Sequence, residues 1–163
     1  MEELALFERL VRSLEGPSQP PRAVESGEPP NPHEFDVRNI HPDLPGSVRR
    51  LFDDGHYEHA TFEAFKFIEK EVKRIAKLRG KTGLALMMEA FNEKNAKILL
   101  NALATDSDED EQLGYKHMFA GAMAGVRNPR GHEIALGDGP SETLDYLALA
   151  SLLLRRLDTA GVR

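Results

Sequence analysis

The stretch that decides the fold is residues 56–78, which read HYEHATFEAFKFIEKEVKRIAKL. Its apolar residues recur at the spacing of one helix face. They are Ala60, Phe62, Phe65, Ile68, Val72 and Ile75. Arg79 and Gly80 follow and predict the end of the helix. A long amphipathic helix is therefore the first element of the predicted fold.

Further helices are predicted on both sides of this stretch. Their ranges are residues 47–53, ended by Gly55; residues 82–91, with Thr82 as candidate cap; residues 107–127; and residues 141–159, capped by Ser141. A short turn or helix is expected at residues 98–103. These residues show no regular β alternation, so the sequence predicts an all-α bundle of about five helices.

The predicted helical domain spans residues 46–163, and two other segments precede it. Residues 1–15 carry apolar side chains at helical spacing and predict an amphipathic helix that docks on this domain or on a partner. Residues 16–45 hold most of the ten prolines and predict an extended linker or a strap over the surface. Near its end Phe35, Val37 and Ile40 alternate, which allows a short strand that seals the strap against the core.

Two of the predicted helices have unusual faces. Residues 119–126 read FAGAMAGV, and glycine inside a helix costs about 1 kcal/mol relative to alanine. Several small residues together therefore predict a close approach of two helix backbones. Residues 141–159 carry leucine around most of the circumference. That helix is expected either at the centre of the bundle or with one face in a dimer.

Composition excludes several classes of protein. The 163 residues include no cysteine, which excludes disulfide scaffolds, cysteine nucleophiles, thiol zinc sites and iron–sulfur sites. The formal net charge of −6 argues against coating nucleic acid through bulk charge but leaves a local basic site open. The sequence shows neither a signal-peptide pattern nor an apolar run of about 18 residues, so we expect a cytoplasmic protein without membrane contact.

The sharpest local motif is RNPRGHE at residues 127–133. Pro129 predicts that the helix ends at Asn128, and Gly131 allows a turn that brings Arg127 and His132 together. Arginine binds phosphate oxygens as a planar fork, and histidine transfers protons near neutral pH, so the cluster suits a phosphodiester. The alternative is a plain helix stop in which arginine complements the last carbonyl groups.

Two charged segments have alternative interpretations. Basic residues concentrate in residues 66–81, which form either a track for a phosphate backbone or a solvated helix face. They are Lys66, Lys70, Lys73, Arg74, Lys77, Arg79 and Lys81, against Glu69 and Glu71. The acidic run at residues 106–111 lacks the pattern of an EF-hand and is interpreted as the start of a helix.

His56 and His59 stand three residues apart on one predicted helix and form a candidate pair of metal ligands. A metal-dependent hydrolase built on them is one hypothesis. No third ligand follows at a recognisable spacing. The alternative is that His56 and Tyr57 pack and hydrogen-bond in the first helical turn.

Three stretches of this sequence, taken in order, resemble the HEPN superfamily and, more closely, its Ymh-type branch of uncharacterised prokaryotic and phage-linked proteins. They are LFDDGHY at residues 51–57, GAMAGVRNPRGHE at 121–133 and YLALASLL at 146–153. Arg127, Asn128 and His132 match the R-x4-6-H motif of that superfamily. Gly131 stands where alanine is expected. The resemblance covers residues 41–158 and implies a HEPN-like helical bundle.

The resemblance implies a metal-independent endoribonuclease that needs no cofactor. The RNA 2′-OH would attack the adjacent phosphate, with His132 as general base or acid, Arg127 stabilising the phosphate charge and Asn128 orienting His132 or holding an oxygen. The expected substrate contacts are Arg130, Lys66, Lys70 and Lys73, and the expected supporting residues are Glu133, His56 and Tyr57.

The same resemblance implies biological partners. Its members usually act as homodimers in which two motifs face one RNA. They are commonly toxins or phage-defence effectors, so a cognate inhibitor or a defence partner protein is expected. Because some members bind nucleotides, RNA or proteins without cutting, a non-catalytic interaction module remains the alternative.

Overall fold

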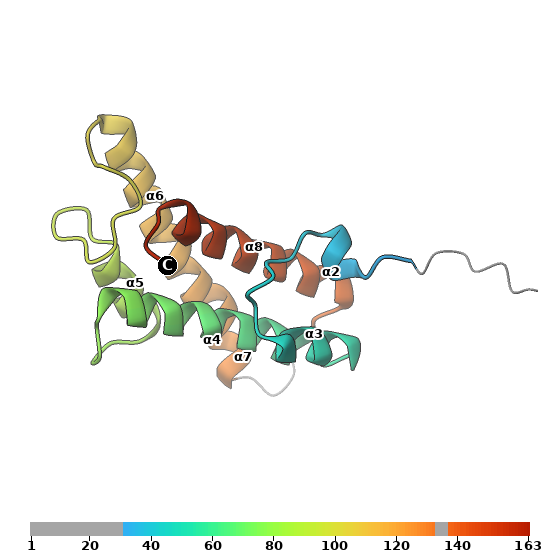
Figure 1. Ribbon diagram of the computed structural model, residues 1–163. Coiled ribbons are helices and arrows are strands. Elements are labelled where there is room, and N and C mark those ends of the chain that lie inside the picture. Colours follow the sequence, from blue (N-terminus) through green and yellow to red (C-terminus); the bar gives the residue numbers. More distant parts are fainter. Residues whose placement is uncertain (1–30, 133–136) are drawn as a thin grey trace, which may run out of the picture. The chain divides into compact units, whose positions relative to one another are not determined.

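The computed structural model describes residues 31–132 and 137–163, which form helices and connecting segments without a β-strand among them (Figure 1). The all-α prediction is confirmed. The predicted N-terminal helix, residues 1–15, and residues 16–30 of the predicted linker lie outside the described residues. No helix of the described part is long and apolar enough to cross a bilayer.

The helices in the middle of the chain begin and end near the predicted residues. They are α3 (Gly46–Asp53), α4 (Tyr57–Ala76) and α5 (Gly83–Ala90). Gly55, with φ of +77°, separates α3 from α4, and Lys77 ends α4 in the left-handed conformation. Thr82 is the N-cap of α5, although its side chain makes no capping bond. Residues 98–103 form bends instead of a helix.

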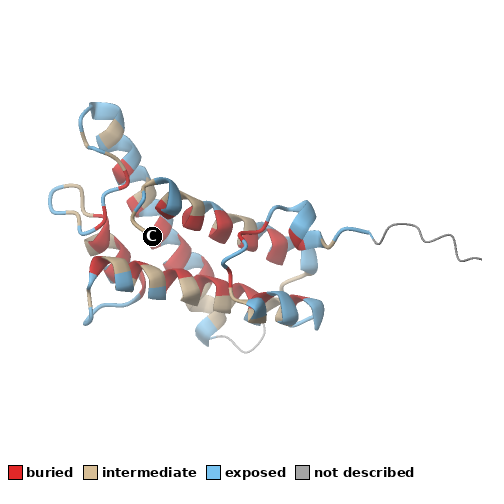
Figure 2. Cartoon of the chain, in the orientation of Figure 1, coloured by how far each residue is buried: buried red, intermediate tan, exposed pale blue. Residues whose placement is uncertain are grey.

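Helix α4 holds the central position. It packs against α3, α5, α7 (Asn128–His132), the π-helical segment η1 (Ala122–Arg127) and α8 (Pro140–Thr159). The buried residues in Figure 2 follow this arrangement, with red along α4 and along the side of α8 that faces it. Among the helices, the leucine-rich α8 packs mainly on α4 and leaves Leu152 exposed, so it does not take the central position that was one of its two predicted placements. The other placement, with one face in a dimer, stays a prediction.

The start of α8 also differs from the prediction. Gly139 is its N-cap, and Pro140 occupies the first helical position, so Ser141 lies inside the first turn and does not cap it. Proline is well suited to that position because its missing N–H would have no partner in the first turn.

Helix α6 (Asp106–Gly121) begins with a capping box. Asp108 N–H donates to Thr105 Oγ1 at 3.2 Å, and Thr105 N–H donates to Asp108 Oδ2 at 3.1 Å. This box confirms the interpretation of the acidic run as a helix start.

The other end of α6 overturns a prediction, because the helix does not stop at Asn128. It widens into η1, where the N–H of Asn128 bonds to the carbonyl of Met123, five residues back, and it continues as α7. Pro129 has no N–H to donate, and the change to longer-range bonds lets the chain pass it without breaking.

The glycines of this long helix do not mark a close contact. A Cβ built on Gly121 or Gly125 would meet no atom of the described part within 4 Å, so the predicted close backbone approach is wrong there. The buried residues of η1 are Ala122, Met123 and Val126. This part of the helix therefore packs through those three residues, and Gly121 and Gly125 face outward.

The segment before α3 is a strap that includes α2 (Glu34–Val37), and the predicted strand at residues 35–40 is wrong. The imidazole of His33 accepts the N–H of Phe35 at 3.0 Å and caps this helical turn. Phe35 and Ile40 are buried while Val37 is 66% exposed, so the strap does seal the core. The compact unit spans Pro32–Arg163, and the predicted domain start at residue 46 lies inside it.

Candidate functional site

The Arg127 guanidinium lies at the edge of the core and is held by two neighbours. Its Nη2 lies 3.2 Å from Glu69 Oε2, and its Nη1 donates to Asn128 Oδ1 at 3.1 Å. The side chain of Glu69 is 8% exposed and that of Arg127 is 24% exposed. A guanidinium has five N–H donors, so both terminal nitrogens keep a donor beyond these two interactions.

The turn between α4 and α5 completes this arrangement. Glu69 Oε1 accepts the N–H of Gly83 at 2.8 Å, so each carboxylate oxygen has its own partner. Gly83 has φ of +56°, and a Cβ built there would lie 3.9 Å from Asn128 Oδ1. Glu69 therefore joins α4, the start of α5 and the junction of η1 with α7.

Phe62 lies two helical turns before Glu69 on α4 and contacts two cations. Arg127 Cζ is 5.3 Å and Lys66 Nζ is 5.5 Å from the centre of its ring. A Cβ on Gly131 would lie 2.9 Å from Phe62 Cε2. The family resemblance predicts alanine at position 131. Glycine in its place lets α7 approach the aromatic ring of Phe62.

Arg130 does not reach the surface as a phosphate contact would. Its Nε and Nη2 donate to the two oxygens of Asp138 at 2.6 and 2.7 Å, and both side chains are 4% exposed. Its Nη1 donates to the carbonyl of Val126 at 2.9 Å. Burial opposes the charge of Arg130, but Asp138 and Tyr146 outweigh burial and raise the pKa of Arg130. Its geometry is that of a structural tie between α7 and the segment before α8.

His132 is the last residue of α7 and is exposed. The prediction that a turn folds His132 back towards Arg127 is wrong, because the helix continues through Pro129. Residues five apart on an α-helix point in directions roughly 140° apart. This spacing therefore favours different helix faces for the two side chains within one chain. Glu133, the predicted supporting residue, lies outside the described residues.

The predicted basic contacts separate into two kinds. Lys66 donates to Glu63 at 2.6 Å, so its charge is paired. Lys70 and Lys73 instead line a surface hollow at the end of α4, together with Arg74, Lys77, Leu78 and Arg79.

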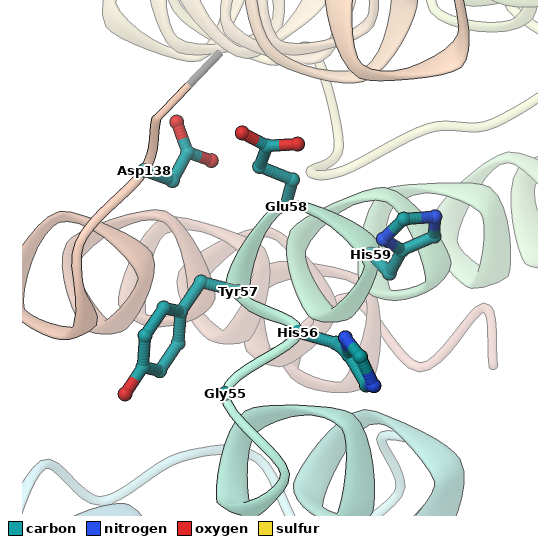
Figure 3. A pocket seen from close by; sticks show the side chains of 6 residues that line it. All are labelled: Gly55, His56, Tyr57, Glu58, His59 and Asp138. Atoms are coloured by element: carbon teal, nitrogen blue, oxygen red, sulfur yellow. The ribbon is translucent and has the colours of Figure 1, made fainter. Parts of the chain in front are cut away.

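His56 and Tyr57 start α4 and line a polar hollow with Gly55, Glu58, His59 and Asp138 (Figure 3). Figure 3 shows the two imidazoles on one side of the helix start and the two carboxylates on another. Tyr57 packs edge-on against Phe52, with ring centres 5.3 Å apart, as first-turn packing predicts. The described residues contain no group of three or more histidine, aspartate or glutamate side chains placed to hold a metal ion.

Sequence reasoning did not identify Glu69, Gly83, Phe62 or Asp138 as site residues. One pattern points to Glu69. It shares the helical register of the core residues Phe65, Val72 and Ala76, and a charged side chain in such a register needs a buried partner. The N–H donor of Gly83 and the pairing of Asp138 depend on the tertiary fold.

Comparison with protein families identifies a family for most of the chain. The family model described as a protein of unknown function (Hypoth_ymh) matches residues 38–157, which include Glu69, Arg127 and His132. No curated protein matches the chain, and neither does any solved structure.

Proposed function

This chain belongs to the Hypoth_ymh family, and from that premise we propose that it is a metal-independent endoribonuclease of the HEPN type. The observation that carries the proposal is the Arg127 guanidinium. Glu69 and Asn128 hold it at the edge of the core with unused donors, and an exposed histidine, His132, follows on the same helix. Arginine and histidine together supply charge stabilisation and proton transfer without a metal ion.

In the proposed reaction His132 takes the proton of an RNA 2′-OH while the 2′-oxygen attacks the adjacent phosphorus. The bond from phosphorus to the 5′-oxygen breaks, and a protonated group or water gives that oxygen a proton. The products are a 2′,3′-cyclic phosphate and a free 5′-OH. Arg127 donates to the non-bridging oxygens, whose negative charge grows in the transition state.

Glu69 and Asn128 support this step by fixing the guanidinium. A donor that is already oriented needs no reorganisation when charge develops, so a held arginine stabilises the transition state better than a mobile one. Glu69 is therefore a positioning residue in this proposal, and Asn128 has its amide nitrogen left to hold a phosphate oxygen or to orient His132.

A homodimer is part of the proposal. Arg127 and His132 leave their helix in different directions, so motifs from two chains facing one RNA would supply both groups to one phosphate. Sedimentation at micromolar concentration tests this point, and a monomer that cuts RNA at full rate would contradict it. The proposed biological role is that of a toxin or phage-defence effector with a cognate inhibitor or partner protein, and it rests on the family resemblance.

The deciding experiment is cleavage of single-stranded RNA in the presence of EDTA. The wild type should yield 2′,3′-cyclic phosphate ends and leave DNA intact. His132→Ala and Arg127→Ala should each lower the rate by about 100-fold or more. His117→Ala changes an exposed histidine of α6 and is the matched control, which should keep full activity. Equal activity of wild type and His132→Ala would refute the assignment.

The second candidate is a non-catalytic module that binds RNA, nucleotides or a partner protein. The burial of Arg130 against Asp138 favours it, because one of the two arginines of the motif then has a structural duty. Under this alternative the wild type cuts nothing, and deletion of residues 1–31, which precede the compact unit, abolishes complex formation while Arg127→Ala does not.

A further inference from the structure

The hollow at the end of α4, which we call the α4 hollow, is lined by Lys70, Lys73, Arg74, Lys77, Leu78 and Arg79. Five of its six residues are cationic in a chain whose net charge is −6. Lys77 bends the backbone into the left-handed conformation at the helix end, and Arg79 follows in the turn towards α5. The hollow therefore gathers charge from the helix and from the turn after it.

Most of this charge is uncompensated. Three basic residues of the same region are paired, and one of them, Arg74, lines the hollow. Lys66 contacts Glu63, Arg74 contacts Glu71 and Lys81 contacts Glu89. Among the described residues, Lys70, Lys73, Lys77 and Arg79 have no carboxylate partner within ion-pair distance. Four of the five cations of the hollow thus remain free for an anion.

Helix electrostatics do not account for such a cluster. The negative end of a helix dipole amounts to about half an elementary charge, far less than the formal charges gathered at the end of α4. Lys70 and Arg74 are a like-charged pair four residues apart on α4, an arrangement that destabilises a helix, and Lys73 and Lys77 add two more cations at its end. A bound polyanion would relieve this repulsion.

The hollow begins next to the proposed catalytic group. Lys73 lies one helical turn after Glu69, about 6 Å along the axis, and Glu69 contacts Arg127. From Glu69 to Lys77 the helix rises about 12 Å, the length of roughly three stacked nucleotides. A single strand whose phosphate meets Arg127 can therefore continue along α4 into the hollow.

We propose that the α4 hollow binds the phosphate backbone of the RNA segment that flanks the cleaved bond. This inference rests on the proposed function of the Arg127 site and deepens it. Lys66 is no longer an expected RNA contact, because its side chain is paired with Glu63. The expected contacts are now Lys70, Lys73, Lys77 and Arg79.

The test measures binding of a fluorescein-labelled 20-nucleotide single-stranded RNA to the full chain carrying His132→Ala, so that the probe stays intact. Lys73→Glu with Lys77→Glu should weaken binding about tenfold or more, and should reduce the slope of log K against log salt by about 1.4 for two lost phosphate contacts. Lys94→Glu with Lys97→Glu makes the same charge change at exposed lysines elsewhere and should have an effect below about twofold. Equal losses in the two double variants would overturn the inference.

A double variant with neutral side chains distinguishes weaker RNA binding from misfolding. Lys73→Gln with Lys77→Gln removes like-charge repulsion, so it should unfold at a urea concentration no lower than the parent while binding RNA more weakly. Unchanged affinity in this pair would overturn the inference. The inference would also be overturned if a polyglutamate peptide bound as tightly as the RNA and depended on the same two lysines. That result would assign the hollow to acidic proteins.

Cleavage assays separate the inference from the proposed function. If wild type cuts RNA and Lys73→Gln with Lys77→Gln cuts a dilute substrate equally fast, the hollow is not the track although the ribonuclease assignment holds. If wild type cuts nothing but RNA binding depends on Lys73 and Lys77, the hollow is confirmed and the ribonuclease assignment fails.

Discussion

Glu69 Oε2 lies 3.2 Å from Arg127 Nη2, and the other oxygen of the same carboxylate accepts the N–H of Gly83 at 2.8 Å. One buried carboxylate therefore satisfies a cation from η1 and a backbone donor from the start of α5. Removing it leaves two polar groups without their partner, and the consequences for stability and for activity can be separated.

Glu69→Ala should lower the free energy of unfolding by about 2–4 kcal/mol. The estimate lies somewhat below the usual loss for a broken buried pair because Arg127 is 24% exposed. Glu69→Gln should lose less, since its amide oxygen can still accept the N–H of Gly83. Urea unfolding gives the numbers. Glu63→Ala, which breaks the exposed pair with Lys66, is the control and should change stability by at most about 0.5 kcal/mol. Equal losses for Glu69→Ala and Glu63→Ala would contradict a buried role for Glu69.

Gly83 and Gly121 should respond to alanine in opposite directions. Gly83 has φ of +56°, where an L-residue costs about 1–2 kcal/mol, so Gly83→Ala should destabilise the protein by that amount. Gly121 is helical and faces open space in the described part, so Gly121→Ala should stabilise it by up to about 1 kcal/mol. Thermal unfolding of both variants checks the signs. A loss of stability in Gly121→Ala would show that the helix face carrying Gly121 is packed and not open to solvent.

The Arg130–Asp138 pair should matter for folding more than any exposed ion pair. Both side chains are 4% exposed, so Asp138→Ala leaves a buried guanidinium and should cost about 3–5 kcal/mol. Arg130→Lys should also destabilise, because one ammonium cannot bond both carboxylate oxygens in the same planar geometry. Asp145→Ala removes the exposed partner of Arg38 and should cost at most about 1 kcal/mol. A small effect of Asp138→Ala in chemical denaturation would argue that Arg130 is free to bind substrate.

The contribution of Arg163 should disappear in acid. Its guanidinium contacts Asp43, Glu71 and Asp158 at 2.9, 3.1 and 3.0 Å. A hydrogen bond from Arg74 is the main cause that lowers the pKa of Glu71 from its ordinary 4.5. Burial opposes this shift, and a hydrogen bond from Arg163 adds to it. Burial opposes the charge of Asp158, but hydrogen bonds from His41 and Arg163 outweigh it and lower the pKa of Asp158 from its ordinary 3.8.

A lowered carboxyl pKa adds stability that is fully present above the unfolded-state pKa and is lost as pH falls through the folded-state pKa. The stability difference between wild type and Arg163→Gln should therefore be constant above about pH 5 and shrink below about pH 4. Urea unfolding at several pH values measures it. Arg155→Gln removes an arginine that bonds the carbonyl of Asn39, so its effect should not vary over this range. A pH-independent effect of Arg163→Gln would contradict the network.

Periodicity predicted the helices well, because the pattern of apolar residues follows directly from which helix face is buried. The bounds of α3, α4 and α5 lie close to the predicted ones. Predictions that depended on a single residue did worse. Pro129 did not end the helix since a π-helical turn accommodates it, and Ser141 did not cap α8 because Pro140 already occupies the first turn.

The candidate site was predicted in part. The RNPRGHE motif identified Arg127, Asn128 and His132, and the structure adds the groups that hold Arg127. Arg130 and Lys66 could not be separated from Arg127 and Lys70 by residue type, because identical side chains differ here in how fully a carboxylate occupies their donors and how deeply they are buried. That difference arises from residues far apart along the chain or from rotamers that spacing does not specify.

The sequence by itself determined the all-α class and the positions of the central helices, since helical periodicity is a local property of the chain. It also determined that the cations of this acidic protein concentrate in residues 66–81 and around residue 127. Only the tertiary structure decided which of those cations are neutralised. Asp138 and Glu69 bury the charge of one arginine and hold another in place, while Lys70, Lys73, Lys77 and Arg79 remain without a carboxylate partner among the described residues. The physical reason is that ion pairing depends on distances of a few ångströms between side chains, and those distances are set by how the helices pack.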